Sequence, residues 1–466
     1  MATEVGCCNE PIFFVLGATG SGKSLAAVKV AQTLQHHSGY ERVIVVNCDV
    51  MQFYADLPIA TNKISSAEME GIPHFFMGFL SPKGVKIRDP TVAYKGCDRE
   101  KCGATAERGK QELYNVHSYV RDAVDFIRNF FQENPFGAVV VCGGTCYYAQ
   151  ALMFDNVLTE EDLDDSLFPD SSVASSSCVE NREGDGLWKE LAQVDPVVAV
   201  RYHPNDKRRI SRLIEIYKKT GRPPSEIYAT RPSPCFRFSP ARCFVLWPCV
   251  TFEKLRTMLD KRVDKMVERG IVQEFIEFAQ TQVKSDLDVG LAKAIGFKEF
   301  LPAFDVINGE FRLKEDVELK KSIELLKTNT KRYARQQIQW IKNRFLGQLR
   351  DVFTSTQGTR QFVCVDASNT ESEFIETVES ATKLLVTFNL QQGKNLTFPL
   401  NQIREPLVSV KQEWCHLCEM FVCGGEKMRL HLASKRHRGA VKHVALVKEQ
   451  QEKYGRVIPP KRRRLS

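Results

Sequence analysis

One octet, Gly17-Ala18-Thr19-Gly20-Ser21-Gly22-Lys23-Ser24, constrains the fold of this chain more than any other segment. The apolar run Ile12–Leu16 before it predicts a buried strand, and the apolar spacing of Leu25–Leu34 after it predicts a helix. Glycines let the backbone wrap a phosphate, while amides, the helix N-terminus and the Lys23 ammonium direct positive charge at it. The octet therefore predicts a polyphosphate-binding loop, the P-loop, without identifying the compound. The residues expected to bind phosphate are Gly17, Gly20, Ser21, Gly22, Lys23 and Ser24, with the Ser24 hydroxyl suited to Mg²⁺.

The segment around this loop alternates between strand and helix patterns. Strand-like runs recur at Arg42–Val46 and Ala138–Cys142, and Asn115–Phe131 between them has helical spacing. Such alternation favours a parallel sheet covered by helices. Residues 11–150 are therefore predicted to form the first part of an α/β core.

The rest of the chain divides into further segments. Residues 151–235 predict a helical insertion, and residues 236–350 a second part of the core, with a strand at Cys243–Pro248 and helical patterns at Phe252–Gln282 and Leu313–Leu349. Residues 351–410 predict an accessory segment and linker, with weak strand and helix signals at Phe362–Val365 and Thr370–Leu390. Residues 94–112 and 166–186 are interpreted as polar insertions.

Composition excludes several classes of protein. Hydrophobic residues make up 43% and charged residues 26%, as in globular proteins, and no apolar run is long enough to span a membrane, so no membrane partner is expected. Residues 1–11 lack a secretory leader. The 15 cysteines are scattered, which favours a reducing compartment over a disulfide framework. We expect a cytoplasmic protein and leave nuclear and mitochondrial locations open.

A short module near the end has the spacing of a zinc site. Cys415 and Cys418 are followed by His431 and His437, a Cys-x₂-Cys-x₁₂-His-x₅-His pattern. We expect both imidazoles to lie on one helix, Glu426–His437, and a structural Zn²⁺ to supply the folding energy that so short a segment lacks. Residues 411–445 are therefore predicted to form a Cys₂His₂ finger, followed by a basic tail at 446–466.

Basic residues point to a polyanionic partner. The net charge is +8, and basic residues concentrate in Lys207–Arg212, Lys327–Arg344 and Lys461–Arg464. Any single cluster has an alternative interpretation as a solvated helix face. The five-residue gap between the histidines resembles matrin/U1-type fingers, which are associated with RNA. The tail has a second interpretation as a nuclear localisation signal.

The segment after the second strand identifies a family resemblance. Asn47-Cys48-Asp49-Val50-Met51-Gln52-Phe53-Tyr54, followed by Thr61-Asn62-Lys63, resembles the tRNA isopentenyltransferase (tRNA dimethylallyltransferase) family in its eukaryotic form. The resemblance covers roughly residues 11–348. Further matches, in order, are Gly71-Ile72-Pro73-His74, Val141-Cys142-Gly143-Gly144-Thr145-Cys146-Tyr147-Tyr148, His203-Pro204-Asn205-Asp206-Lys207-Arg208-Arg209, Arg262-Val263-Asp264-Lys265-Met266, Ile295-Gly296-Phe297-Lys298-Glu299-Phe300 and Arg332-Tyr333-Ala334-Arg335-Gln336-Gln337.

The resemblance implies transfer of a dimethylallyl group from its diphosphate to the exocyclic amine of the adenosine 3′ to the anticodon, a base flipped into a channel. Asp49 would accept the proton of the amine, Thr19 would orient it, and Arg262 would neutralise the departing diphosphate with Lys23, Ser24 and Mg²⁺. Taken alone, Asp49 has an equal alternative as a helix cap or a kinase magnesium ligand, and Arg262 as a surface residue.

The same resemblance, with the basic clusters, suggests residues that contact the tRNA anticodon stem-loop. They are Val50, Met51, Gln52, Thr145, Arg208, Arg209, Arg212, Arg335, Gln337 and Lys342. Val50 and Phe75 depart from the family pattern, which has Ser and His there, and Ala18 lies in a variable position. Because Thr19, Asp49 and Arg262 are present, we expect an active, monomeric enzyme.

Three other functions remain as alternatives. A P-loop kinase of a nucleoside or small molecule needs only Lys23, Ser24 and Asp49. An adenylate isopentenyltransferase that modifies free nucleotide has no use for a finger. A non-enzymatic RNA-binding protein would not need Asp49.

Overall fold

The structure is a computed structural model, in which the chain divides into two compact units. The first contains residues 1–169 and 233–406, and the second residues 170–232 and 407–466. The described residues are 10–96, 113–155, 184–200, 202, 204, 206–230, 235–282, 290–307, 310–314, 316–349, 362–388, 412–415, 417, 420–423, 425–434, 437, 438, 441 and 445.

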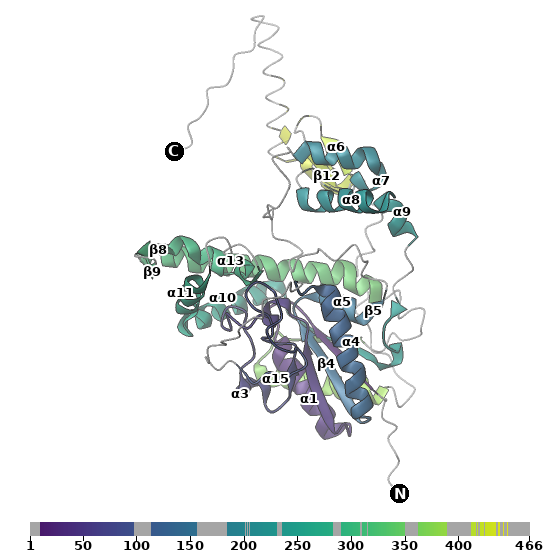
Figure 1. Ribbon diagram of the computed structural model, residues 1–466, viewed down its shortest axis with the longest axis vertical. Helices are drawn as coiled ribbons and strands as arrows, with labels where there is room; N and C mark the ends of the chain where they lie inside the picture. Colours follow the sequence, from purple (N-terminus) through teal and green to yellow (C-terminus); the bar gives the residue numbers. More distant parts are fainter. Residues whose placement is uncertain are drawn as a thin grey trace, which may run out of the picture. The chain divides into compact units, whose positions relative to one another are not determined.

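A six-stranded sheet forms the centre of the first unit (Figure 1), and every strand pairing in it is parallel. The predicted parallel α/β core is thereby confirmed. In sheet order the strands are β10 (Phe362–Asp366), β7 (Cys243–Cys249), β1 (Ile12–Leu16), β4 (Gly137–Gly143), β2 (Arg42–Asn47) and β3 (His74–Phe75).

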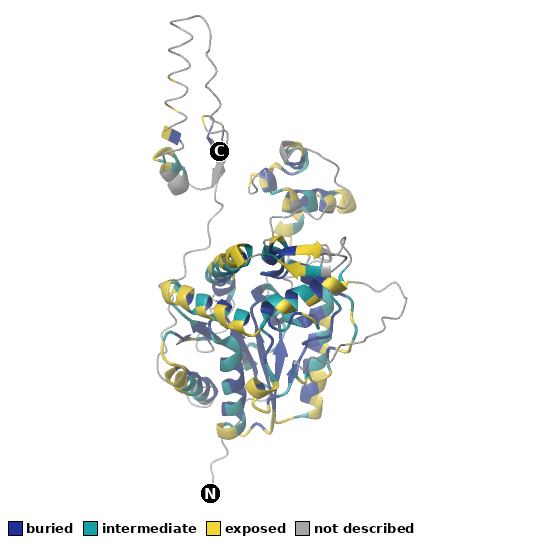
Figure 2. Cartoon of the chain, turned by 90° about the vertical axis from the view of Figure 1, so that its left-hand side faces the viewer, coloured by how far each residue is buried: buried dark blue, intermediate teal, exposed yellow. Residues whose placement is uncertain are grey.

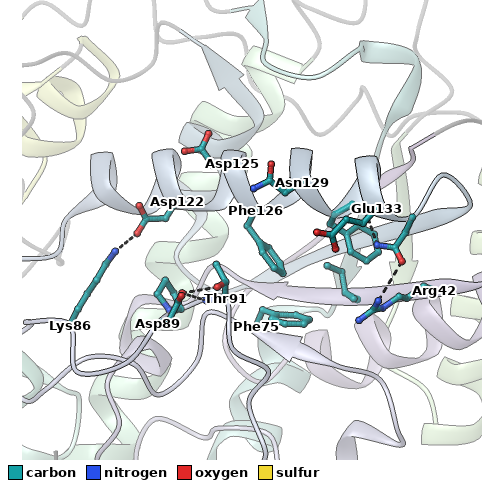
Figure 3. Close-up of a pocket in the computed structure, with 14 residues that line it drawn as sticks. Arg42, Phe75, Lys86, Asp89, Thr91, Asp122, Asp125, Phe126, Asn129 and Glu133 are labelled. Carbon is teal, nitrogen blue, oxygen red and sulfur yellow. Dashed lines mark hydrogen bonds and ion pairs between the residues drawn. The ribbon is translucent and has the colours of Figure 1, made fainter.

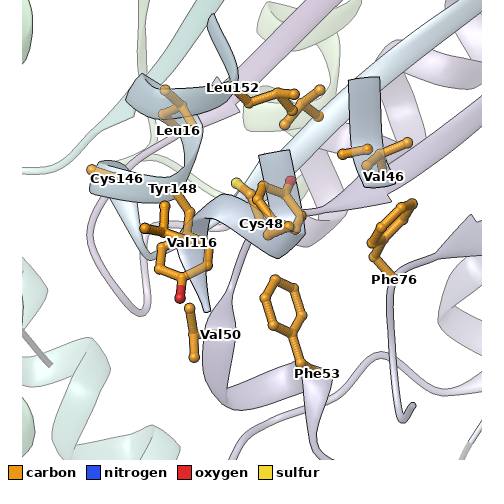
Figure 4. Packing of buried hydrophobic residues seen from close by; sticks show 14 of the residues in the cluster. Leu16, Val46, Cys48, Val50, Phe53, Phe76, Val116, Cys146, Tyr148 and Leu152 are labelled. Atoms are coloured by element: carbon orange, nitrogen blue, oxygen red, sulfur yellow. The ribbon is translucent and has the colours of Figure 1, made fainter. Parts of the chain in front are cut away.

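Alternating side chains of β1 enter two separate layers of core. Phe13 and Val15 pack with the face that carries α1 (Lys23–His37) and α15 (Glu371–Phe388). Phe14 and Leu16 pack with the other face, which carries α4 (Val116–Glu133) and α5 (Cys146–Met153). Figure 2 shows the strands buried between these helices, and Figure 4 shows the second layer around Cys48, Phe53 and Tyr148. Both faces are covered, as a parallel sheet requires.

The strand and helix after residue 361 belong to this core, which corrects the prediction of an accessory segment. β10 pairs with β7, and α15 packs against α1 in the same hydrophobic cluster. The sequence signal is weak because β10 is a short edge strand in which buried and exposed side chains are mixed. Cys249 and Cys364 form a disulfide between β7 and β10, whereas Cys48, Cys142 and Cys146 are free thiols.

The long helical patterns are interrupted. Phe252–Gln282 divides into α10 (Phe252–Glu268) and α11 (Ile271–Thr281), because Gly270 adopts φ 93° between them. The pattern at 313–349 contains α13 (Asp316–Trp340), which continues into a π-helical turn, Ile341–Phe345. Ion pairs hold α10 on α13: Lys331 to Asp260 at 2.7 Å and Lys327 to Asp264 at 2.8 Å. Two lysines of the predicted basic cluster are thus engaged within the protein.

Shorter elements complete the first unit. They are α2 (Val50–Phe53), α3 (Ser66–Met69), α12 (Phe297–Phe300), the 3₁₀ turns Pro240–Arg242, Gly290–Lys293 and Leu301–Ala303, the antiparallel pair β5 (Phe154–Asp155) and β6 (Cys235–Phe236), and the hairpin β8 (Phe304–Ile307) and β9 (Glu310–Leu313).

The second unit contains the helical insertion and the small C-terminal module. The helical insertion has a hydrophobic cluster of its own, which includes the buried residues Leu191 and Ile210. Its helices are α6 (Gly184–Val194), α7 (Pro196–Ala199), α8 (Lys207–Thr220) and α9 (Pro224–Ala229). The described part of the predicted insertion, residues 184–230, contains these four helices, whereas residues 154–155 belong to β5. The module has an antiparallel pair, β11 (Gln412–Cys415) and β12 (Met420–Cys423), followed by α16 (Gly425–Leu432).

Candidate active site and metal centre

Three chain segments meet at the carboxyl end of the sheet because of strand order. β1, β4 and β2 are neighbours, and Leu16 lies level with Gly143 while Asn47 lies level with Cys142. The residues that follow these positions are the P-loop, Gly144 and Asp49. Ligands of open parallel sheets bind at this end. The register therefore places the predicted phosphate and catalytic groups together.

The P-loop has the backbone of a phosphate cradle. Gly20 and Gly22 adopt φ of 77° and 81°, a region that glycine enters without strain. A methyl group on Gly17 would lie 2.8 Å from the Ser21 Oγ, a buried atom without a hydrogen-bond partner among the described residues. The Lys23 Nζ donates to the Ala18 carbonyl at 2.8 Å, and burial lowers the pKa of Lys23. A bound anion would replace that carbonyl and favour the charged form.

Asp49 is held by its neighbours in the turn after β2. Its Oδ1 accepts the N–H of Met51 at 3.1 Å, so Asp49 caps α2. The buried Asn47 side chain accepts the Asp49 N–H at 3.0 Å and donates to the Phe76 carbonyl at 3.0 Å. The sequence alone indicates no role for Asn47. It orients the turn that carries the carboxylate.

Gly144 allows three functional side chains to approach one point. A methyl group there would lie 2.8 Å from Asp49 Oδ2, 3.0 Å from Gln337 Nε2 and 3.7 Å from Lys23 Nζ. A side chain at position 144 would fill this space. The second glycine of the Gly-Gly-Thr element therefore keeps the site open.

Gln337 joins two walls of the site. Its Oε1 accepts the N–H of Thr19 at 2.7 Å, and its Nε2 donates to the Gly144 carbonyl at 2.8 Å. Tyr333 lies one turn earlier on α13, and burial raises the pKa of that phenol. We predicted Gln337 as a tRNA contact, but its carboxamide is buried and bonded within the protein. Sequence reasoning gave Tyr333 no role.

The Arg262 guanidinium interacts electrostatically with both Lys23 and Asp49. Burial lowers its pKa to about 10, which still leaves it charged near neutral pH, and the neighbouring Asp49 carboxylate opposes that shift. Its Nε is buried with no hydrogen-bond partner among the described residues. The Asp260 and Asp264 ion pairs flank it on α10 and fix the helix that carries it. An unpaired buried donor beside the P-loop suits an anionic leaving group.

The remaining predicted tRNA contacts near Asp49 are mostly engaged in packing. The Val50 side chain is 1% exposed and lies in the core (Figure 4), so it does not support the predicted contact. The Thr145 Oγ1 accepts the Val50 N–H at 3.1 Å, and the Gln52 Nε2 donates to the Asn62 carbonyl at 3.0 Å. Met51 is only partly buried. These residues shape the turn around Asp49.

The predicted basic contacts lie on helices of both units. Arg209 pairs with Asp206 and Arg212 with Glu215 on α8, at 3.1 and 3.0 Å. On α13, the Arg335 guanidinium lies 4.4 Å from the centre of the Phe252 ring, and Lys342 follows in the π-helical turn. The Arg208 side chain falls outside the described residues. Trp340 packs against the core beside Phe345.

A surface pocket of 660 Å³ lies elsewhere, along α4 and the start of β2 (Figure 3). Its lining carries Asp89, Asp122, Asp125 and Glu133, against Lys86 and Arg42. Carboxylates outnumber cations, so the pocket does not suit a diphosphate or RNA. It also lies at the opposite end of β2 from Asp49.

The C-terminal module gathers three of its four predicted ligands. Ligand atoms of Cys415, His431 and His437 all lie within 4.8 Å of one another. The His431 Nε2 is buried without a hydrogen-bond partner among the described residues, a state that a metal bond would relieve. Cys418 falls outside the described residues. The donors of Cys415, His431 and His437 therefore fit Zn²⁺.

The predicted single helix Glu426–His437 is wrong. α16 ends at Leu432, a turn follows, and the His437 N–H then donates to the Ser434 Oγ at 3.2 Å. Because α16 ends before His437, that residue can return to the ligand cluster that contains His431.

Among the described helices, none combines the length and apolar composition needed to cross a membrane.

Comparison with known proteins shows similarity over most of these residues. Residues 108–344 match the profile of the family described as IPP transferase. A tRNA dimethylallyltransferase of Schizosaccharomyces pombe is 32% identical over 349 residues, which cover 72% of this chain and 69% of that protein. A tRNA dimethylallyltransferase of Mus musculus is 29% identical over 455 residues, covering 92% and 85%. A solved eukaryotic dimethylallyltransferase acting on tRNA aligns with a TM-score of 0.68 and 26% identity, covering 96% of this chain and 100% of that one.

Proposed function

The chain belongs to the IPP transferase family, and we propose that it transfers a dimethylallyl group from dimethylallyl diphosphate to the exocyclic amine of a tRNA adenosine. The adenosine is the one immediately 3′ of the anticodon, at tRNA position 37. The observation that carries the proposal is the approach of Asp49, Lys23 and Gln337 to Gly144, with Arg262 beside them.

The reaction exchanges one bond for another. The amine nitrogen bonds to the first carbon of the dimethylallyl group as the carbon–oxygen bond to diphosphate breaks. The bonding electrons leave with diphosphate, and the amine proton passes to Asp49. A positioned carboxylate helps because an adenine amine is a poor nucleophile.

Charge on the departing diphosphate is matched by the P-loop. Its amides, the Lys23 ammonium and the Arg262 guanidinium surround the place where negative charge develops. Ser24 is the second residue of α1 and has a partly exposed side chain, and its hydroxyl together with diphosphate oxygens would hold Mg²⁺. That ion would supply further neutralisation of the leaving group.

The acceptor is RNA rather than a free nucleotide. The basic side chains Arg208, Arg209, Arg212, Arg335 and Lys342, with Met51, are proposed to contact the anticodon stem-loop. Most would touch phosphates and set the orientation of the tRNA. The finger is proposed to bind one Zn²⁺. Together with the basic tail, its lysines and arginines would add affinity for RNA that does not depend on sequence. We propose a monomer that works in the cytoplasm.

A transfer assay tests this function directly. The protein is incubated with labelled dimethylallyl diphosphate and either tRNA or AMP, without ATP. We expect label only in tRNA, at the adenosine 3′ to the anticodon. Preferential labelling of AMP would favour the adenylate transferase, and phosphorylation of a nucleoside when ATP is added would favour the kinase.

Removing the metal ligand His431 is expected to release the zinc and weaken tRNA binding. His431→Ala should lower the zinc content from one ion per chain to none and reduce the salt dependence of tRNA affinity, because fewer phosphates are neutralised. Zinc is measured by mass spectrometry and affinity by titration over a series of salt concentrations. His416→Ala, which removes the histidine next to Cys415 in the sequence, is the matched control, and loss of zinc there would contradict the ligand set.

A further inference from the structure

Two glycines of the P-loop, Gly20 and Gly22, are packed on their open sides by apolar side chains. A methyl group on Gly20 would lie 2.6 Å from Leu259 Cδ2, and one on Gly22 would lie 3.0 Å from Phe374 Cε1 and 3.2 Å from its Cζ. Leu259 is on α10, one turn before Arg262. Phe374 is on α15, in a part of the chain beyond the matched family profile.

Phe374 is fixed in place by the core. It is 5% exposed and belongs to the cluster of α1 and α15. The strand before it, β10, pairs with β7, and the Ala367 N–H donates to the Cys249 carbonyl at 2.8 Å. The ring is therefore a rigid surface against the loop.

Gly22 is the position where the loop needs such support. It adopts φ 81° at the N-terminus of α1 and has no side-chain cap. Glycine is the residue with the greatest backbone freedom, so an unsupported Gly22 would sample other conformations. The amides that receive phosphate depend on its conformation. Packing by a buried ring preorganises them before the ligand binds.

We propose that Phe374 is a positioning residue for diphosphate binding, which acts by holding Gly22 in the phosphate-receiving conformation. The inference rests on the proposed function for the identity of the donor. It assigns a functional role to the β10–α15 segment, because that segment delivers the ring to the loop.

Phe374→Ala is the principal test. We expect the KM for dimethylallyl diphosphate and the Kd for inorganic diphosphate with Mg²⁺ each to rise about tenfold. The reason is that the unsupported loop must then lose conformational entropy each time it binds the ligand. The KM for tRNA should stay unchanged. Phe374→Leu, which keeps an apolar contact and is expected to fold, should give a smaller rise in the same two constants.

Leu385→Ala provides the matched control. Leu385 is 1% exposed on the same helix and lies eleven residues, about 16 Å, further along it. Its truncation should lower thermal stability at least as much and leave both diphosphate constants unchanged. Equal effects of the two alanine variants on those constants, or no effect of either Phe374 variant, would overturn the proposal.

The binding arm separates this inference from the proposed function. If the wild type binds inorganic diphosphate but transfers nothing to tRNA, the proposed function fails, while a selective loss in Phe374→Ala still supports the positioning role. If the wild type binds no diphosphate, the positioning role fails as well.

Discussion

Replacing Asp49 by asparagine is expected to lower kcat for dimethylallyl transfer by about 10²–10⁴-fold, the range for loss of a positioned general base. Asparagine keeps the side-chain oxygen that caps α2 at Met51, since Asn and Asp are comparable caps. The Asn47 contact to the backbone N–H of residue 49 also survives. The folded turn should therefore persist without its proton acceptor. Single-turnover transfer to an anticodon stem-loop measures the effect.

The control must separate chemistry from binding. Asp125→Asn makes the same chemical change on an exposed face of α4 and should leave kcat unchanged. The affinity of Asp49→Asn for tRNA should match the wild type in a direct binding titration. Normal transfer by Asp49→Asn would exclude the carboxylate as the base, whereas tRNA binding without transfer by either the wild type or the variant would favour a non-enzymatic RNA-binding protein.

The core of the fold could be predicted because its signals are local. The run Ile12–Leu16 is bounded by the P-loop glycines, and the observed β1 has the same bounds. β10 was harder to assign, because an edge strand gains its identity from pairing with β7, which is more than a hundred residues away in sequence. Hydrophobic spacing also missed the break at Gly270, which depends on a single positive φ.

The site shows the same division between local and long-range information. Asp49, Lys23 and Arg262 could be named from motifs, and strand order explains why the first two meet. The supporting roles of their neighbours could not be predicted from sequence. The sequence predicts Gln337 as a tRNA contact, and only the folded chain shows its side chain bonded to Thr19 and Gly144. Phe374 occupies an ordinary apolar position within the helical pattern Thr370–Leu390, and nothing in that spacing reveals the glycine opposite it.

Replacing Arg262 by glutamine is expected to lower kcat by about 10²–10³-fold, as expected for loss of one preorganised donor to developing negative charge. The ground-state affinity for dimethylallyl diphosphate should fall less, because the P-loop amides and Lys23 remain. Arg256→Gln, at an exposed position on the same helix, is the matched control and should keep wild-type kcat. A comparable loss of kcat in both variants would mean that any arginine-to-glutamine change on α10 impairs the enzyme, and that Arg262 has no specific role in stabilising the leaving group.

The pH dependence of Arg262→Lys tests the charge itself. Burial lowers the pKa of the arginine from 12.5 to about 10, and the same environment should lower the pKa of a lysine from its ordinary value of about 10.4. The charged form exists below the pKa and is lost as pH rises through it. The alkaline decline of kcat/KM, which reports groups of the free enzyme, should therefore begin at lower pH in Arg262→Lys than in the wild type. An unchanged alkaline decline, with kcat reduced at every pH, would indicate that the geometry of the guanidinium matters and its titration does not.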